Sequence, residues 1–271
     1  MTADPTTSPP SGVDPNTPSI ARVYDYYLGG KDNFAADREL AEQVLLVAPN
    51  ARATARANRN FLVRATEAVA MAGIRQFVDL GTGIPTSPNV HEVAQQIKPC
   101  AHVAYIDNDP IVLCHARALL AGTRPGVIAM EGDVRAPEQV LDHPRLRAHI
   151  DFAQPVAIFL VAMLHLLTDE DRPEQLVKTI SERMAPGSYL VLSHLWDDPD
   201  GVGRAGADAY ARRKASSPVV PRTTEQIQRF FDGFELVEPG LVFLDQWRPI
   251  EDMINAGADD RLCLCAVGRK P

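Results

Sequence analysis

Acidic residues and a pair of glycines follow three short apolar segments, at positions where they could bind an adenosine. Gly81 and Gly83 come directly after the first segment, and they let the backbone turn sharply and approach a ligand closely. Asp107 ends the second segment, where a carboxylate can accept hydrogen bonds from both hydroxyls of a ribose. Asp133 follows the third segment, where an acid can accept a hydrogen bond from the adenine amino group. One such acid is more often a helix cap or a solvated loop residue, but three at successive segment ends predict a ligand site.

The residues around the glycine pair distinguish two kinds of adenosine cofactor. A dinucleotide fingerprint requires a third glycine that packs the helix on the strand, and this sequence has Thr86 there, after Pro85. Asp79 stands two positions before the first glycine, where its charge would oppose a pyrophosphate. An acid at this position suits a ligand that carries an amino group and no phosphates, such as S-adenosylmethionine. NAD or NADP is the alternative, because the same glycine turn serves both kinds of ligand.

The elements that hold these residues alternate between strands and helices after residue 73. Apolar strands without polar alternation, separated by helices, indicate a parallel sheet that is covered on both faces. The last strand follows its neighbour without a clear crossover helix, so we expect it to be antiparallel. The predicted strands are 76–80, 102–106, 127–130, 156–161, 188–193, 234–238 and 262–268. The predicted helices in this part are 89–97, 110–120, 169–184, 203–214 and 224–231.

Before the first strand, the pattern is helical. Helices are predicted from Ser19, which can cap the first of them, to Gly29, from Asp37 to residue 47, and over 52–72. Residues 1–17 are rich in Pro, Thr, Ser and Asp, and we expect them to form a disordered tail. The fold class is therefore α/β, a Rossmann-like doubly wound sheet of about seven mostly parallel strands. We expect a tail over 1–17, a helical cap over 18–73 and the sheet domain over 74–271.

Composition limits the partners and the location of the protein. Its 271 residues have a formal net charge of −8, which argues against a protein that holds nucleic acid by neutralising phosphates, and against a polybasic membrane anchor. The longest apolar run, 156–167, is shorter than the ~20 residues that span a bilayer. We expect a cytoplasmic protein with four reduced cysteines, without a signal peptide, membrane segment or metal site, because its histidines share no metal-ligand spacing.

These motifs resemble those of the class I S-adenosylmethionine-dependent methyltransferases. The stretch 79–83 (DLGTG) looks like their first motif, Asp107 like their ribose acid, 132–134 (GDV) like their adenine motif and 159–165 (FLVAMLH) like their fourth-strand motif. One bacterial subgroup with largely unassigned substrates is similar over residues 17–270. It shares the stretch 27–34 (YLGGKDNF), which is specific to the subgroup, and a stretch like 56–61 (RANRNF).

The resemblance implies a role for each of several residues. The loop 29–33 is a candidate lid, from which Lys31 or Asn33 meets the methionine carboxylate while Asp79 takes the amino group. His165 is the candidate general base for the methyl acceptor. The full set of expected cofactor contacts is Lys31, Asn33, Asp79, Gly81, Thr82, Gly83, Asp107, Asn108, Asp133, Val134 and Ala162.

The implied function is a methyltransferase that uses S-adenosylmethionine and acts on a small-molecule acceptor, because nothing basic favours a nucleic acid. Trp196, Tyr210 and Trp247 are candidates to line the acceptor pocket, although each is as often a core residue. Two alternatives differ in class. One is an NAD(P)-dependent oxidoreductase that uses the same glycine turn. The other is a protein that binds S-adenosylmethionine without turning it over, because no strong catalytic constellation is visible.

Overall fold

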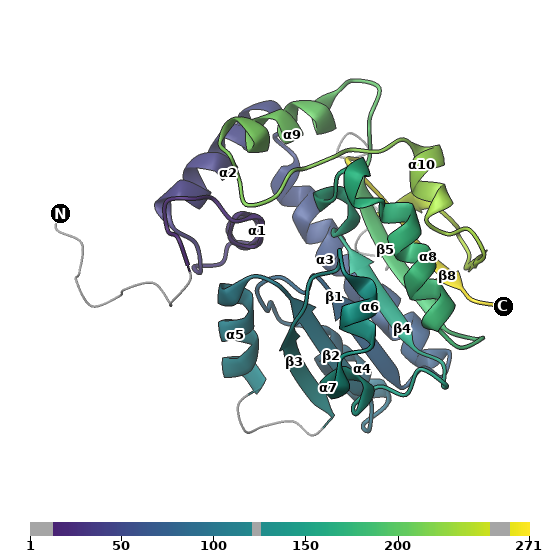
Figure 1. The fold of residues 1–271 in the computed structure, drawn as a ribbon. Helices are drawn as coiled ribbons and strands as arrows, with labels where there is room; N and C mark the ends of the chain where they lie inside the picture. Colours follow the sequence, from purple (N-terminus) through teal and green to yellow (C-terminus); the bar gives the residue numbers. More distant parts are fainter. Residues whose placement is uncertain (1–12, 121–125, 250–260) are drawn as a thin grey trace.

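One twisted sheet runs through the centre of the protein, with helices on both faces and a helical cap above one edge (Figure 1). The computed structural model describes residues 13–120, 126–249 and 261–271. Within these ranges eight strands join in the order β3-β2-β1-β4-β5-β8-β6, and β7 pairs with β8. The strands are β1 (Gln76–Leu80), β2 (His102–Asp107), β3 (Val127–Glu131), β4 (Ala157–Val161), β5 (Tyr189–Leu195), β6 (Glu235–Leu236), β7 (Val242–Phe243) and β8 (Cys263–Arg269).

The first five strands are parallel, and β8 runs antiparallel to β5, as the sequence predicts. Their carboxyl ends therefore meet at one edge, which is where open α/β sheets bind ligands. The order reverses between β1 and β4, the point of the sheet where such folds form their crevice. Sequence analysis finds seven strands and misses β7, because two residues carry no detectable alternation.

Both faces of the sheet are buried, which explains why the strands lack polar alternation. Phe77 and Phe159 lie in the core under one layer of helices, and Val78 and Ile158 lie in the core under the other layer. The first layer contains α3 (Ala51–Met71), α4 (Val90–Ile97) and α5 (Pro110–Leu120). The second contains α6 (Pro137–Leu141), α7 (Pro144–Arg147), α8 (Pro173–Arg183) and α10 (Thr224–Arg229).

The helix expected over 169–184 is divided in two. A 3₁₀ turn, Asp169–Asp171, precedes α8, and Arg172 between them has φ 51°. Pro173 explains the division. A proline lacks the amide that would continue the hydrogen-bond ladder, and it suits the first turn of a new helix.

The cap contains α1 (Ile20–Leu28), α2 (Ala35–Val47) and the first turns of α3, and α9 (Val202–Arg212) packs against them. Figure 1 shows α9 beside α2, although the two helices are far apart in the sequence. The cap therefore extends beyond the expected 18–73 to include the segment after β5. The carboxyl-terminal half of α3 lies on the sheet, because Phe61 and Val69 belong to its core.

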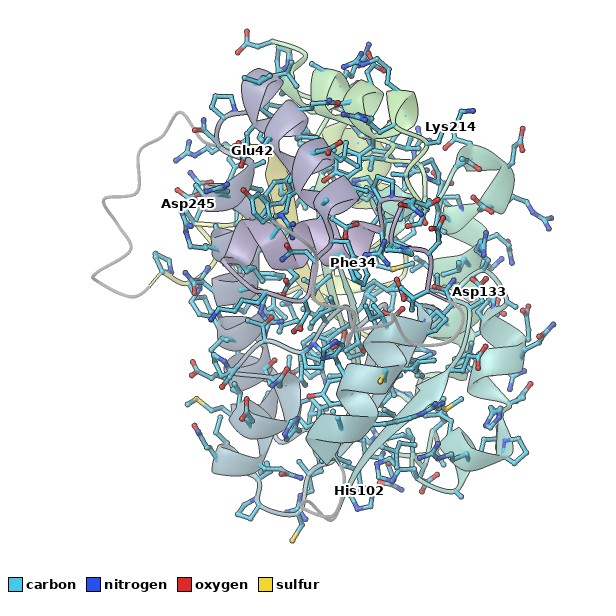
Figure 2. The ribbon with its side chains drawn as sticks, turned by 90° about the vertical axis from the view of Figure 1, so that its left-hand side faces the viewer. Phe34, Glu42, His102, Asp133, Lys214 and Asp245 are labelled. Carbon is cyan, nitrogen blue, oxygen red and sulfur yellow. The ribbon has the colours of Figure 1, made fainter. Side chains whose placement is uncertain are left out.

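Figure 2 shows where the cap meets the sheet. Glu42 and Lys214 mark the outer cap, Phe34 and Asp133 lie at the junction, and His102 at the start of β2 lies at the opposite end. None of the helices in the described ranges is both long and apolar enough to span a bilayer.

The expected disordered tail divides at residue 13. Residues 1–12 lie outside the described residues, but 13–17 form a bent segment that packs on the protein. The carbonyl groups of Asp14 and Thr17 both accept hydrogen bonds from the buried Arg22 side chain, at 3.1 and 2.6 Å. The boundary predicted at residue 17 is therefore too late, because composition alone does not register these backbone contacts.

Candidate functional site

A cavity of about 580 Å³ lies between the cap and the carboxyl ends of the first four strands. Ten of the predicted site residues line it, and Lys31 and Asn33 do not. The ten come from the ends of β1, β2, β3 and β4 or the loops that follow, as parallel strand topology requires. They are Asp79, Gly81, Thr82, Gly83, Asp107, Asn108, Asp133, Val134, Ala162 and His165.

Asp79 is a buried carboxylate on β1 with no hydrogen-bond partner among the described residues. The pKa of Asp79 is raised to about 7, chiefly by burial, while the neighbouring Arg59 opposes the rise and the Asp107 charge adds to it. An unpaired buried carboxylate is costly, and an ammonium group placed beside it would remove that cost. The buried Asp79 carboxylate therefore fits a ligand that carries an amino group, whereas it would repel a pyrophosphate.

Asp107 is held in place by the backbone around it. Its Oδ2 accepts the amide of Gly83 at 2.9 Å, and its Oδ1 accepts the amide of Asp109 at 2.9 Å. Burial nevertheless raises the pKa of Asp107. Each carboxylate oxygen has a second lone pair, so Asp107 retains the capacity to accept hydrogen bonds from two adjacent hydroxyl groups.

The glycine turn packs directly against the segment after β4. Gly81 has φ +77°, and a Cβ at this position would overlap the Met163 sulfur. Ala162 precedes Met163 and has φ 55°, a conformation that alanine rarely adopts. The Ala162 amide donates to Ser193 Oγ at 2.9 Å, which fixes this strained turn against β5.

Asp133 forms an ion pair with Arg135, which also lines the cavity. The Arg135 guanidinium donates to both carboxylate oxygens and holds the pKa of Asp133 below its ordinary value. Asp133 is thus ionised at neutral pH and pre-oriented at the cavity wall. Val134 next to it is buried and supplies an apolar surface on which a flat ring can pack.

The loop 29–33 does not close the cavity, contrary to expectation. Asp25 Oδ2 accepts the Asp32 amide at 2.9 Å and the Asn33 side chain at 2.8 Å, so the loop folds back on α1. Lys31 is exposed to solvent. Lys31 and Asn33 do not line the cavity in this arrangement, so their contacts with the methionine carboxylate stay a prediction.

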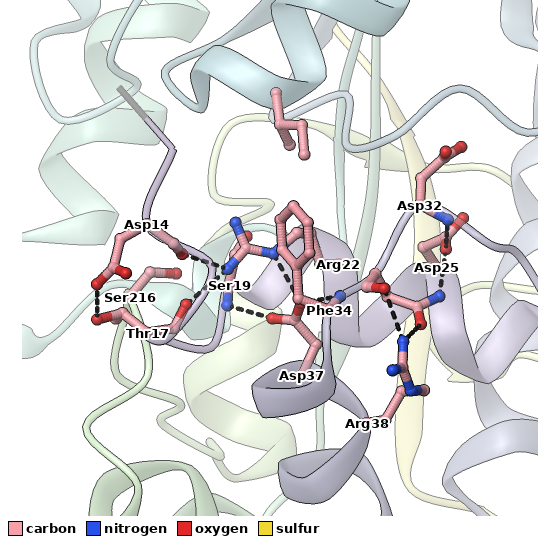
Figure 3. A network of polar contacts seen from close by, with 12 residues as sticks. Asp14, Thr17, Ser19, Arg22, Asp25, Asp32, Phe34, Asp37, Arg38 and Ser216 are labelled. Carbon is pink, nitrogen blue, oxygen red and sulfur yellow. Dashed lines mark hydrogen bonds and ion pairs between the residues drawn. The ribbon is translucent and has the colours of Figure 1, made fainter. Parts of the chain in front are cut away.

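The segment that does cover the cavity precedes α1 (Figure 3). Arg22 and Asp37 form a buried ion pair at 2.8 Å, and Asp37 also accepts the amides of Ser19 and Phe34. Ser19 does not cap α1 with its side chain. Its hydroxyl donates instead to Asp109 at 2.8 Å, which ties the cap to the loop after β2.

His165 lines the cavity, but its geometry does not suit a general base. Its Nδ1 accepts the Leu195 amide at 3.2 Å, which leaves Nε2 as the protonated, donating nitrogen. Burial, with the positive charge of Arg222, lowers the pKa of His165 to about 4. The ring is therefore neutral at pH 7, and its one acceptor atom is already used.

Of the three aromatic residues considered for the acceptor pocket, only Tyr210 lines the cavity. Trp247 is fully buried against Phe61 with a ring separation of 5.4 Å. Trp196 packs edge-on against Phe243. The two tryptophans are therefore packing residues.

Two cavity residues on α3 were not predicted individually. Arg59 donates to the carbonyl groups of Thr86 and Pro88, and so it anchors the loop after β1. Asn58 is buried and binds both Tyr24 and Ser193. The 56–61 stretch, singled out by its resemblance to the subgroup, was the signal that could have found them.

The doubly wound strand order and the antiparallel last strand define a Rossmann-like methyltransferase fold. The S-adenosyl methyltransferase family model matches residues 6–271, and the chain belongs to this family. It is an S-adenosylmethionine-dependent methyltransferase, which decides the choice of cofactor against NAD and NADP.

Two solved structures are similar over nearly the whole chain. A protein from Thermobifida fusca, classed with the methyltransferases, is 44% identical with a TM-score of 0.91, over 98% of this chain and 99% of its own. A DUF574 family protein from Streptomyces avermitilis is 41% identical with a TM-score of 0.89, over 95% and 99%. No protein of curated function matches the sequence.

Proposed function

We propose that this protein transfers the methyl group of S-adenosylmethionine to a small-molecule acceptor that binds under the helical cap. The observation that carries the proposal is the placement of Asp79, Asp107 and Asp133 around one cavity, at the ends of three adjacent strands. The net charge of −8 supports a small molecule rather than a nucleic acid. The bacterial sources of both similar structures support a bacterial source for this protein.

In this proposal each of the three acids binds a different part of the cofactor. Asp79 would bind the ammonium group, Asp107 the ribose hydroxyls, and Asp133 the adenine amino group, with Val134 against the ring. When bound, S-adenosylmethionine supplies a methyl carbon activated by the sulfonium charge. The protein then aligns the acceptor's lone pair with that carbon and excludes water, which is the main work of such a site.

No base is required for an acceptor whose nucleophilic atom does not have to lose a proton during the transfer. His165 does not provide one, since Nδ1 is occupied and the pKa is about 4. The phenol of Tyr24 lies in the cavity, but burial raises its pKa to about 12. We therefore propose catalysis by alignment and desolvation, with Asn58 and Tyr24 as polar groups of the wall.

Calorimetric titration with S-adenosylmethionine, S-adenosylhomocysteine, NAD and NADP tests the cofactor. We expect only the first two to bind, and Asp107→Ala to weaken binding by about 1.5–3 kcal/mol, the range for a hydrogen bond to a charged group. Asp232→Ala is the control, because this exposed aspartate lies outside the cavity. Unchanged affinity in Asp107→Ala would contradict the assigned site.

Turnover is tested by following S-adenosylhomocysteine release while panels of small molecules are added to the protein. Release that depends on one added compound supports the proposal. Tight cofactor binding without release under any panel would favour a sensor that binds S-adenosylmethionine only.

A further inference from the structure

The part of the cavity that faces the cap differs in chemistry from the part that faces the strands. We call it the cap chamber, and it is formed by the cavity-lining residues of α1 from Tyr24, of α2 with its C-cap Ala48, of α3 up to Asn58, and of α9. None of these described residues is charged. The charged residues of the cavity, such as Asp79 and Arg135, belong instead to the strand ends, the segment before Tyr24 or the later part of α3.

The chamber exists because its walls carry small residues. Ala48 and Ala55 face it from α2 and α3, and Gly206 and Ala207 face it from α9. A Cβ on Gly206 would meet Ala48 and Val44 at 3.9 Å, which is ordinary contact. Packing therefore does not require glycine here, although glycine in a helix costs about 1 kcal/mol relative to alanine. The missing side chain of Gly206 leaves room in the chamber that a bound molecule could occupy.

The chamber wall also carries polar groups: the Asn58 side chain, the Thr54 hydroxyl, which has no hydrogen-bond partner among the described residues, and a pair of phenols. The hydroxyls of Tyr27 and Tyr210 lie 3.3 Å apart, so one donates to the other. The second hydroxyl hydrogen has no acceptor among the described residues and is available to a ligand. Burial raises the pKa of Tyr210 to about 12 and that of Tyr27 further, so both phenols are neutral. Tyr24 differs, because it donates to the Ala55 carbonyl and accepts from Asn58.

We infer that the methyl acceptor is an uncharged, mainly apolar small molecule with an oxygen that accepts a hydrogen bond from the Tyr27–Tyr210 pair. This inference rests on the proposed function, which places the acceptor under the cap. A charged acceptor would lose its hydration in the chamber and meet no opposite charge there. An apolar body gains by leaving water, and the free hydroxyl hydrogen of the phenol pair orients it.

A matched series of naphthalenes tests the inference on the protein saturated with S-adenosylhomocysteine. The probes are 2-naphthol, naphthalene-2-carboxylate and 2-naphthyltrimethylammonium, titrated at pH 7 by calorimetry. We expect 2-naphthol to bind at least tenfold more tightly than either ion. Equal affinities, tighter binding of an ion, or failure of 2-naphthol to bind at about 1 mM would each overturn the inference.

Three variants locate the binding. Gly206→Leu fills the chamber and should abolish 2-naphthol binding, whereas Asp208→Leu places the same side chain on the exposed face of α9 and should not. Tyr27→Phe with Tyr210→Phe should weaken 2-naphthol about tenfold and leave unsubstituted naphthalene unchanged. Retained 2-naphthol binding in Gly206→Leu would place it elsewhere and overturn the inference.

The cofactor titration separates this inference from the proposed function. If S-adenosylhomocysteine does not bind the wild-type protein, the proposed function fails. If it binds and the naphthalene series shows no preference for the neutral member, only the acceptor class fails. The wild-type series requires no variant to fold.

Discussion

Ser193 on β5 donates a 2.6 Å hydrogen bond to the side-chain oxygen of Asn58 on α3, 135 residues away in sequence. The Asn58 nitrogen donates in turn to the Tyr24 hydroxyl, and Ser193 accepts the amide of Ala162. This chain of bonds runs from the cap helix α1 through α3 to the turn after β4. It couples the position of the cap to the segment that packs on the glycine loop.

Asn58→Ala should destabilise the protein by about 1–3 kcal/mol, because it leaves two buried hydroxyl groups without their partner. Urea unfolding measures the loss. Asn60→Ala, at an exposed position of the same helix, is the control. The Asn58→Ala, Ser193→Ala double variant should lose less free energy of unfolding than the sum of the losses in the two single variants. Strict additivity would show that the two residues do not interact.

Binding of S-adenosylmethionine should strengthen as the pH rises from 5.5 to 7. Asp79 has a pKa of about 7 in the free protein and must lose its proton to pair with an ammonium group. Below that pKa the affinity should fall by up to about tenfold per pH unit. Calorimetry in two buffers of different ionisation enthalpy measures the released proton. Asp79→Asn should bind weakly without this pH dependence, and a wild-type affinity that is flat with pH would contradict the pairing.

The same group makes the cofactor-free protein less stable as the pH rises. The folded state holds the Asp79 proton between the ordinary pKa of 3.8 and about 7, whereas the unfolded chain has released it. The Asp79 contribution to the free energy of unfolding therefore decreases through this window. The difference in free energy of unfolding between wild type and Asp79→Asn, measured at several pH values, should show this slope. A difference that does not change with pH would refute it.

Gly81→Ala should be more damaging than Gly83→Ala. Both glycines have positive φ, +77° and +67°, so alanine costs about 1–2 kcal/mol at either position. At Gly81 the new Cβ also displaces Met163, while at Gly83 no atom lies within 4 Å. We expect Gly81→Ala to lose cofactor affinity as well as stability. Titration and urea unfolding of the pair measure this, and equal losses would contradict the Met163 contact.

Arg22→Ala should destabilise the protein by about 3–5 kcal/mol, because it leaves the Asp37 carboxylate buried without its partner. The matched control is Arg183→Ala, since the Arg183–Asp142 pair is exposed and its loss should cost about 1 kcal/mol or less. Thermal unfolding of both variants gives the comparison. A small effect at Arg22 would show that the cap does not depend on this ion pair.

The sheet and its ligand-binding edge could be predicted because their signals are local. Each of the first three strands ends at or beside a glycine or an acid, and parallel topology then brings Asp79, Asp107 and Asp133 to one edge whatever the details of packing. The antiparallel β8 followed from a missing crossover helix. These features depend on the order of segments and not on long-range contacts.

The cap could not be predicted to the same depth because its contacts join distant parts of the chain. Nothing near Lys31 in the sequence shows that Asp25 holds the loop 29–33 away from the cavity. His165 has the residue type and place of a base, but the Leu195 amide on another strand occupies its acceptor nitrogen. Neither the folding of α9 onto α2 nor the Tyr27–Tyr210 pair has a local signature.

Because α9 is inserted between β5 and α10, its sequence can vary independently of the sequence at the strand ends. The strand ends of the proposed cofactor site and the helix α9 of the proposed acceptor site share no segment of chain. Substitutions in α9 can therefore change the molecule that receives the methyl group while the donor site is kept. Under the proposed function, this eleven-residue helix is one part of the acceptor wall that could be varied without altering the strand ends.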